Sequence, residues 1–142
     1  MKSISIGKLL ITIVALYAAA GSYIFDWNET HIYNPLWPPH AKFHNAQTML
    51  LGTSIGLASL WVLWTLKGGK LPFLRISTLL ASLYWLTQAG SILFPGTALV
   101  DPQFAHLGQA PAQLIVDAIM LTLLAIGYPL EVNRLRNAHQ LD

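Results

Sequence analysis

Apolar residues run along this chain in long blocks that contain no charge. Four such blocks cover residues 9–25, 43–66, 76–100 and 102–116, and the last continues past Asp117 to residue 130. Each is close to the roughly 20 residues that a helix needs to cross a hydrocarbon layer about 30 Å thick. Residues 1–142 are therefore predicted to form a single all-α domain, an integral membrane four-helix bundle.

The breaks between the blocks carry residues that start or stop helices. Pro39 can open a helix, the Lys67–Lys70 turn contains two glycines, and Pro95 ends the third block. A short helix is expected after Asp101-Pro102, and the fourth span is expected to end at Tyr128-Pro129. These signals predict transmembrane helices at about residues 5–26, 39–66, 73–94 and 109–130.

Positive charge is divided unevenly between the two sides of this arrangement. Of the 8 Lys and Arg residues, only Lys42 falls on the side opposite the termini. Because basic loops stay in the cytoplasm, both termini are expected to be cytoplasmic, in the bacterial inner membrane or, in a eukaryote, the endoplasmic reticulum. A cleaved secretory signal ending near Ala18–Gly21 is the alternative for the first block, but the apolar run continues to Phe25 and favours a retained helix.

Composition narrows the classes of function. The chain is 54% hydrophobic and 10% charged, against roughly 25% charged in an average soluble domain, which excludes a soluble globular protein. A net charge of +2 does not supply the basic surface that nucleic-acid binding requires. The absence of cysteine excludes disulfides, thiolate catalysis and Cys-ligated metals. The expected partners are the lipid bilayer and a lipophilic small molecule.

Two histidines share one face of the second predicted helix. If this helix begins near Pro38, then His40, His44 and Gln47 stand at i, i+4 and i+7. A divalent metal can bridge two imidazoles at this spacing, given a further ligand from the same side of the membrane. The alternative is that the imidazoles and Trp37 lie at headgroup level, where they bind water or lipid. The candidate further ligands are Asp26, Glu29, His31 and His106.

Asp117 is the most specific polar signal in the spans. A charged group at the centre of a membrane helix costs at least about 2.5 kcal/mol, so Asp117 is expected to face the bundle interior. The alternative role is a neutral acid in an interhelical hydrogen bond. At 1.5 Å per residue, Gln47, Gln88 and Asp117 all fall roughly 9–12 Å below the outer helix ends, which predicts one outward-opening pocket bounded by spans two to four. The expected ligand-binding residues are Gln47, Tyr84, Gln88, Gln113 and Trp37.

Small residues on the second span favour close helix contact. Gly52 and Gly56 form a small-x-x-x-small seam, and Ser59 adds one further small position. The seam is expected either to pack inside the chain or to join two copies in a homo-oligomer.

One segment carries a resemblance to known proteins. Residues 31–44 read H-x-x-N-P-x-W-P-P-H-A-x-F-H, which resembles a family of small four-span membrane proteins classed as a domain of unknown function. Some such proteins bear an acetyltransferase label, but this chain has no acyl-donor motif. More loosely, the architecture is similar to the DoxX-like group and to the sterol-isomerase and sigma-2-receptor superfamily, whose helices enclose an apolar cavity with buried acids. The resemblance assigns no catalytic residue.

Three functions are compatible with these features. The first is a binding module for a lipophilic ligand. The second is an enzyme of the isomerase, cyclase or hydroxylase type, with His40 or His44 as acid or base and Asp117 holding a proton, either alone or assisted by a metal on His40, His44, Glu29 and His106. The third is a structural subunit of a membrane complex.

Overall fold

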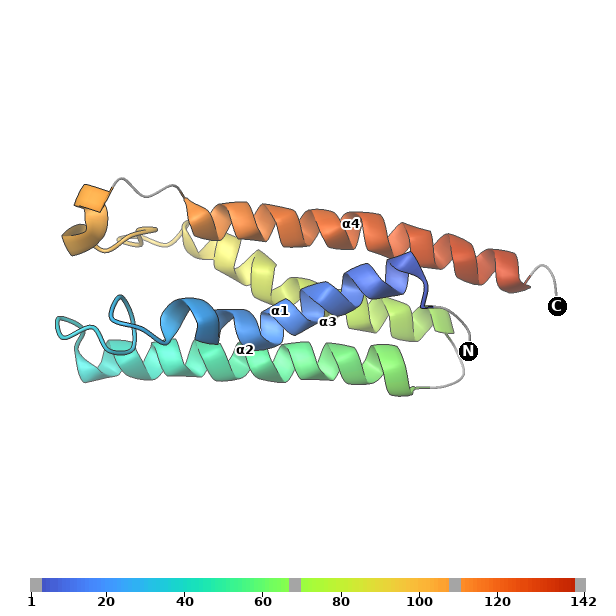
Figure 1. Ribbon diagram of the computed structural model, residues 1–142, viewed down its shortest axis with the longest axis horizontal. Coiled ribbons are helices and arrows are strands. Elements are labelled where there is room, and N and C mark those ends of the chain that lie inside the picture. The colour runs from blue at the N-terminus through green and yellow to red at the C-terminus, as the bar shows by residue number, and fades with distance from the viewer. Residues whose placement is uncertain (1–3, 67–69, 108–110, 140–142) are drawn as a thin grey trace.

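The computed structural model describes residues 4–66, 70–107 and 111–139, which form an all-α bundle of four long helices (Figure 1). The all-α class is as predicted. The limits of the first two helices differ from the expected ones by one residue or less. The elements are α1 (Ile6–Asp26), α2 (Pro39–Thr65), α3 (Lys70–Ser91), the short 3-10 helix η1 (Pro102–Leu107) and α4 (Ala112–His139).

The end of α4 differs from the prediction. The helix continues through Pro129 to His139 instead of ending at Tyr128-Pro129. Proline removes one backbone donor, but the turns beyond it are stabilised by the burial of Val132 and Leu135. Packing thus outweighs the local cost of the proline.

A polar cluster also holds α4 beyond Pro129. Glu131 is 4% exposed. It accepts hydrogen bonds from the Ser5 hydroxyl and from Arg134 Nη2, the latter at 2.6 Å. This cluster ties the last turns of α4 to the start of α1.

The outer surface of the bundle is apolar. Leu50, Leu57 and Leu79 are 62%, 56% and 59% exposed, while Ser59 and Ser77 are fully buried. This distribution is the reverse of a soluble domain and suits a lipid environment. Three helices are long and apolar enough to cross a membrane, residues 6–26, 39–65 and 112–138. These features indicate a membrane protein.

The centre of the bundle lies between α1 and α3. These two helices contact each other across the bundle, whereas α2 and α4 make no contact within the described residues. Four side chains of α1, those of Ile11, Val14, Ala15 and Ala18, are fully buried. α1 is therefore the central helix of the core.

The glycine seam of α2 packs against α1 inside the chain. A Cβ atom at Gly56 would lie 2.5 Å from the Ala15 carbonyl oxygen, and one at Gly52 would lie 2.8 Å from that of Ala18. Only glycine permits this approach. The seam is thus occupied within the chain, and a homo-oligomer through it stays a prediction.

The two ends of the bundle differ in charge. α1 begins and α4 ends at one end, while residues 27–38 and η1 lie at the other (Figure 1). Basic residues of the described chain gather toward the first end, and the second carries three acids and one lysine. The first group is Lys8, Lys70, Arg75, Arg134 and Arg136, and the second is Asp26, Glu29, Asp101 and Lys42.

Candidate functional site

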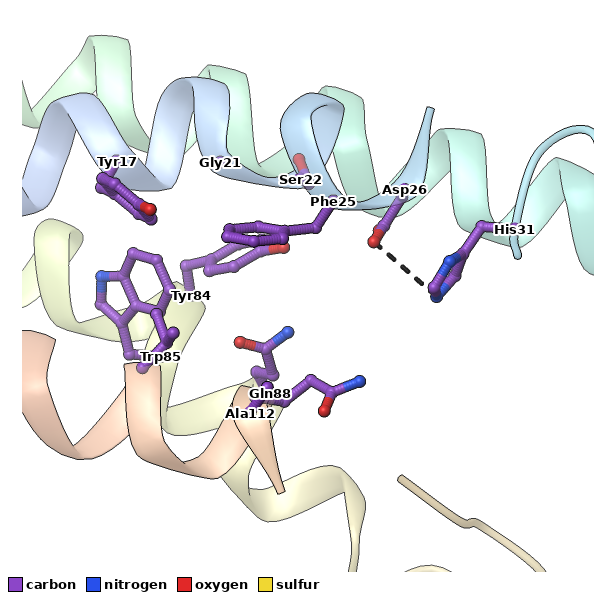
Figure 2. Close-up of a pocket in the computed structure, with 12 residues that line it drawn as sticks. Tyr17, Gly21, Ser22, Phe25, Asp26, His31, Tyr84, Trp85, Gln88 and Ala112 are labelled. Carbon is purple, nitrogen blue, oxygen red and sulfur yellow. Dashed lines mark ion pairs between the residues drawn. The ribbon is translucent and has the colours of Figure 1, made fainter. Parts of the chain in front are cut away.

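A cavity of about 160 Å³ lies between α1, α3 and α4, toward the end of the bundle that carries residues 27–38 (Figure 2). Its lining has an aromatic part, deep between the helices, and a polar part nearer the mouth. The lining residues are Tyr17, Gly21, Ser22, Phe25 and Asp26 of α1, His31 of the loop that follows α1, Tyr84, Trp85 and Gln88 of α3, and Ala112, Gln113 and Val116 of α4.

The aromatic part is a continuous wall of rings. The Tyr17 and Trp85 ring centroids are 6.1 Å apart, those of Tyr84 and Trp85 are 5.0 Å apart, and those of Tyr17 and Phe25 are 6.4 Å apart. Tyr17, Gly21 and Phe25 recur every four residues, so one face of α1 supplies two rings and the space between them. Such a wall favours a flat apolar group.

An acid and an imidazole meet at the mouth. Asp26 Oδ1 lies 3.7 Å from His31 Nε2, as the dashed line in Figure 2 shows. Asn45 Nδ2 of α2 donates to Asp26 Oδ2 at 3.2 Å. The Thr30 hydroxyl lies 2.7 Å from His31 Nδ1 and 2.6 Å from Asn28 Oδ1. Both imidazole nitrogens therefore have a polar neighbour, an arrangement that suits acid–base chemistry.

The two connections at this end are joined above the mouth. Trp37 Nε1 donates to Asp101 Oδ2 at 2.7 Å, and the Trp37 ring packs edge-on against His31 with centroids 5.3 Å apart. Gln113 Nε2 donates to the Leu99 carbonyl oxygen at 3.1 Å. These contacts link residues 27–38 to the segment before α4, so they fix the rim of the cavity.

Several buried polar atoms around the cavity have no partner. Among the described residues, Ser22 Oγ, Trp85 Nε1 and both Asp117 carboxylate oxygens accept or donate no hydrogen bond. All three side chains are at most 4% exposed. A buried unsatisfied group costs about 1–3 kcal/mol, so this part of the bundle is suited to a molecule that brings hydrogen-bonding groups.

Three of the predicted ligand-binding residues line the cavity, and two do not. Tyr84, Gln88 and Gln113 are lining residues. Trp37 lies against His31 instead, and Gln47 is exposed on α2. Asp117 is buried, as expected, but it lies one turn beyond Gln113 and is not among the lining residues.

The predicted pocket walls need correction. Among the described residues, α2 contributes nothing to the lining, so α1 takes the place that was expected for span two. The reason is the glycine seam, which turns the Gly52 face of α2 toward α1 and leaves His40 and His44 exposed. The histidine pair therefore lies outside the cavity lining.

The predicted metal set is not assembled. No group of three or more His, Asp and Glu side chains able to hold an ion occurs in the parts of the chain that the structure describes. Glu29 and His106 are therefore not grouped with His40 and His44, whose Nε2 atoms lie 3.1 Å apart.

The contribution of α1 to the cavity was not predicted from the sequence. Tyr17, Ser22 and Phe25 lie in an apolar span, and Asp26 and His31 were expected only as metal ligands. The four-residue recurrence of Tyr17, Gly21 and Phe25 was the available signal for a lining face.

Comparison with known proteins identifies a family and no function. A family model described as a family of unknown function (DUF6640) matches residues 10–140. The chain belongs to this family. No curated protein and no solved structure matches it.

Proposed function

We propose that this member of the DUF6640 family is a four-span membrane protein that binds a small lipophilic molecule in the cavity between α1, α3 and α4. The observation that carries the proposal is the cavity itself, with an aromatic wall at one end and Asp26, His31, Gln88 and Gln113 at the other. Ligand sites combine mostly apolar walls with a few convergent polar groups in this way. The ligand would carry a flat apolar body and at least one hydrogen-bonding group.

The proposed membrane protein has four spans, because α3 is added to the three helices that are apolar enough to cross a membrane. α3 packs against each of the other three helices, and its face toward α2 buries Ser77. α3 also exposes Ile76, Leu79 and Leu86, so it presents an apolar face to lipid as the other helices do. The basic end of the bundle would lie in the cytoplasm under the positive-inside rule, which makes the cavity open on the opposite side. A bacterial inner membrane or an endoplasmic reticulum membrane fits this orientation.

The size of the cavity limits the ligand. Its volume is about 160 Å³, close to the roughly 150 Å³ cavity that holds one benzene molecule in a well-studied engineered case. The enclosed part of the ligand would thus be about one six-membered ring. The unpartnered Ser22 hydroxyl and the Gln88 amide would bind its polar group, and any longer apolar chain would extend through the mouth.

A simple phenol tests this proposal because it has a ring and one hydroxyl group. In mild detergent, 4-fluorophenol should show saturable binding to the purified protein by fluorine NMR, above its partition into protein-free micelles. Gly21→Leu should remove this binding because the added side chain fills the cavity, while Leu57→Ala on the outer surface of α2 should leave it unchanged. Equal binding by the wild type and Gly21→Leu, with both folded by circular dichroism, would overturn the proposal.

A second candidate function rests on the pair at the mouth. Asp26 and His31, 3.7 Å apart, could transfer a proton to or from the bound molecule, as an isomerase requires. This assignment moves the acid–base role from His40 or His44 to His31. Protein incubated in D₂O with membrane lipid extract should then place deuterium in one lipophilic compound, detected by mass spectrometry.

The same assay separates the two functions. His31→Gln and Asp26→Asn should abolish deuterium incorporation, and Gly21→Leu should remove both incorporation and phenol binding. Incorporation that is equal with and without the protein would contradict the enzymatic function and leave the binding function. Absence of both phenol binding and incorporation would favour a structural subunit instead.

A further inference from the structure

We infer that His40 and His44 form a site for one divalent transition-metal ion of the type that imidazole prefers, separate from the cavity. Both side chains lie on the first two turns of α2 and are exposed. Their Nε2 atoms are 3.1 Å apart, and their ring centroids are 4.5 Å apart. The inference does not depend on the proposed function, because α2 contributes no described residue to the cavity lining.

The distance between the two nitrogens suits an ion. With metal–nitrogen bonds of about 2.05 Å, two ligands on a tetrahedral ion lie about 3.3 Å apart, and two at a right angle lie about 2.9 Å apart. The observed 3.1 Å falls between these values. Both rings could therefore reach one ion by rotation of these exposed side chains.

Gln47 places the lone pair of His44 on the correct nitrogen. Gln47 Oε1 lies 3.1 Å from His44 Nδ1, and an amide oxygen can only accept. With the Gln47 oxygen toward the ring, the tautomer that satisfies this contact carries its proton on Nδ1 of His44 and leaves Nε2 as the acceptor. A partner on the far nitrogen that fixes the tautomer is the usual outer contact of a metal-bound histidine.

His40 completes the site by changing its tautomer. In the ion-free arrangement His40 Nε2–H donates to His44 Nε2, which satisfies the 3.1 Å contact. When an ion binds, the His40 proton moves to Nδ1, and both Nε2 atoms present lone pairs. The Phe43 ring stacks parallel to His40, with an interplanar angle of 7°, and helps to orient it.

The composition of the site predicts which ions bind. No described carboxylate joins the two histidines in a set of three ligands, so water or lipid phosphate oxygens would complete the coordination. Neutral nitrogen ligands favour Cu²⁺ over Zn²⁺ and exclude Mg²⁺ and Ca²⁺, which take oxygen ligands. The helix start next to the site also disfavours positive charge, so the affinity should be modest.

The site lies close to the cavity mouth along the chain. Asn45 follows His44 directly and donates to Asp26, whose carboxylate faces His31. An ion on His40 and His44 would join the two successive turns of α2 that end at His44, directly before Asn45. Metal binding would thus stabilise the turn that holds the mouth.

The test uses Cu²⁺ and Zn²⁺ with tag-free protein in mild detergent. We expect one Cu²⁺ per chain, with electron paramagnetic resonance hyperfine structure from two equivalent nitrogens, and competition by Zn²⁺. His40→Ala and His44→Ala should each lose binding at concentrations that saturate the wild type, while His106→Ala binds normally. All four proteins should show the same circular dichroism, because the altered side chains are exposed.

A second pair of variants isolates the positioning role of Gln47. Gln47→Leu should weaken Zn²⁺ binding about tenfold, as loss of an outer partner of a ligand does, and Gln47→Glu should restore it because a carboxylate also accepts from Nδ1–H. Unchanged copper stoichiometry and an unchanged spectrum in His40→Ala or His44→Ala would overturn the inference, and so would the absence of any binding to the wild type.

Discussion

Asp26 and His31 face each other at 3.7 Å across the mouth of the cavity, the first as the last residue of α1 and the second from the loop that follows. The same carboxylate accepts from Asn45 of α2. A single acid therefore joins α1, the loop and α2 at the entrance. Because His31 also packs against Trp37, which is bound to Asp101, the entrance is held by contacts from both connections.

Because α1 and α2 approach closely at Gly56, a methyl group added there is predicted to destabilise the fold. Gly56→Ala should destabilise the fold by about 1–3 kcal/mol, the usual cost of overpacking, because its Cβ atom would meet the Ala15 carbonyl oxygen at 2.5 Å. The matched control is Gly90→Ala in α3, where nothing lies within 4 Å of the new atom. It should be neutral or stabilising by up to about 1 kcal/mol. Thermal unfolding in detergent measures both, and equal stability of the two variants would contradict the helix packing.

The pair Ser59 and Ser77 predicts a coupled loss of stability. Ser59 Oγ donates to the Ser77 carbonyl oxygen at 2.9 Å, and Ser77 Oγ donates to the Ser59 carbonyl oxygen at 3.0 Å. Each Ser→Ala change should cost about 0.6 kcal/mol, the average for a polar contact between membrane helices. The two hydroxyls lie 3.1 Å apart, so the double variant should cost less than the sum of the singles. A double-mutant cycle in detergent measures this coupling. Strict additivity of the two stability losses would argue against contact between α2 and α3 at these serines.

Substitution of Asp117 by an apolar residue is predicted to increase the stability of the protein. Both of its carboxylate oxygens are buried without a partner in the described chain. Replacing an unsatisfied buried group by an apolar one removes its desolvation cost, so Asp117→Leu should raise the unfolding free energy of the ligand-free protein by about 1–3 kcal/mol. Asp117→Asn, which keeps the shape and the polarity, should gain less. A strong loss of stability in Asp117→Leu would instead assign Asp117 to a structural hydrogen bond between helices.

The absence of cysteine makes the topology directly measurable. Single cysteines at the exposed positions Glu29, Thr97 and Asn137 should react with a membrane-impermeant maleimide according to side. In right-side-out vesicles, Glu29→Cys and Thr97→Cys should be labelled directly, and Asn137→Cys only after permeabilisation. Labelling of Thr97→Cys and Asn137→Cys from the same side would contradict the four-span arrangement, since α4 would then not cross.

The sequence predicted the helices better than the site, for a physical reason. Charge-free length and prolines determine where a helix lies along its axis, and in the structure Tyr84, Gln88 and Gln113 line one cavity. Depth alone does not give the rotation of a helix about its axis. At 100° per residue, His44 and His40 lie about 80° and 120° from Gly52, so once the glycine seam packs on α1, both histidines turn outward.

The most direct measurement of the cavity is its experimental density in the protein purified from its native membrane in mild detergent. We predict a continuous non-protein feature, larger than a water molecule, in the cavity against the Tyr17 and Trp85 rings and within hydrogen-bond distance of Gln88 or Ser22. A cavity closed by rearranged side chains, or a feature on the lipid-facing surface only, would contradict a ligand-binding function.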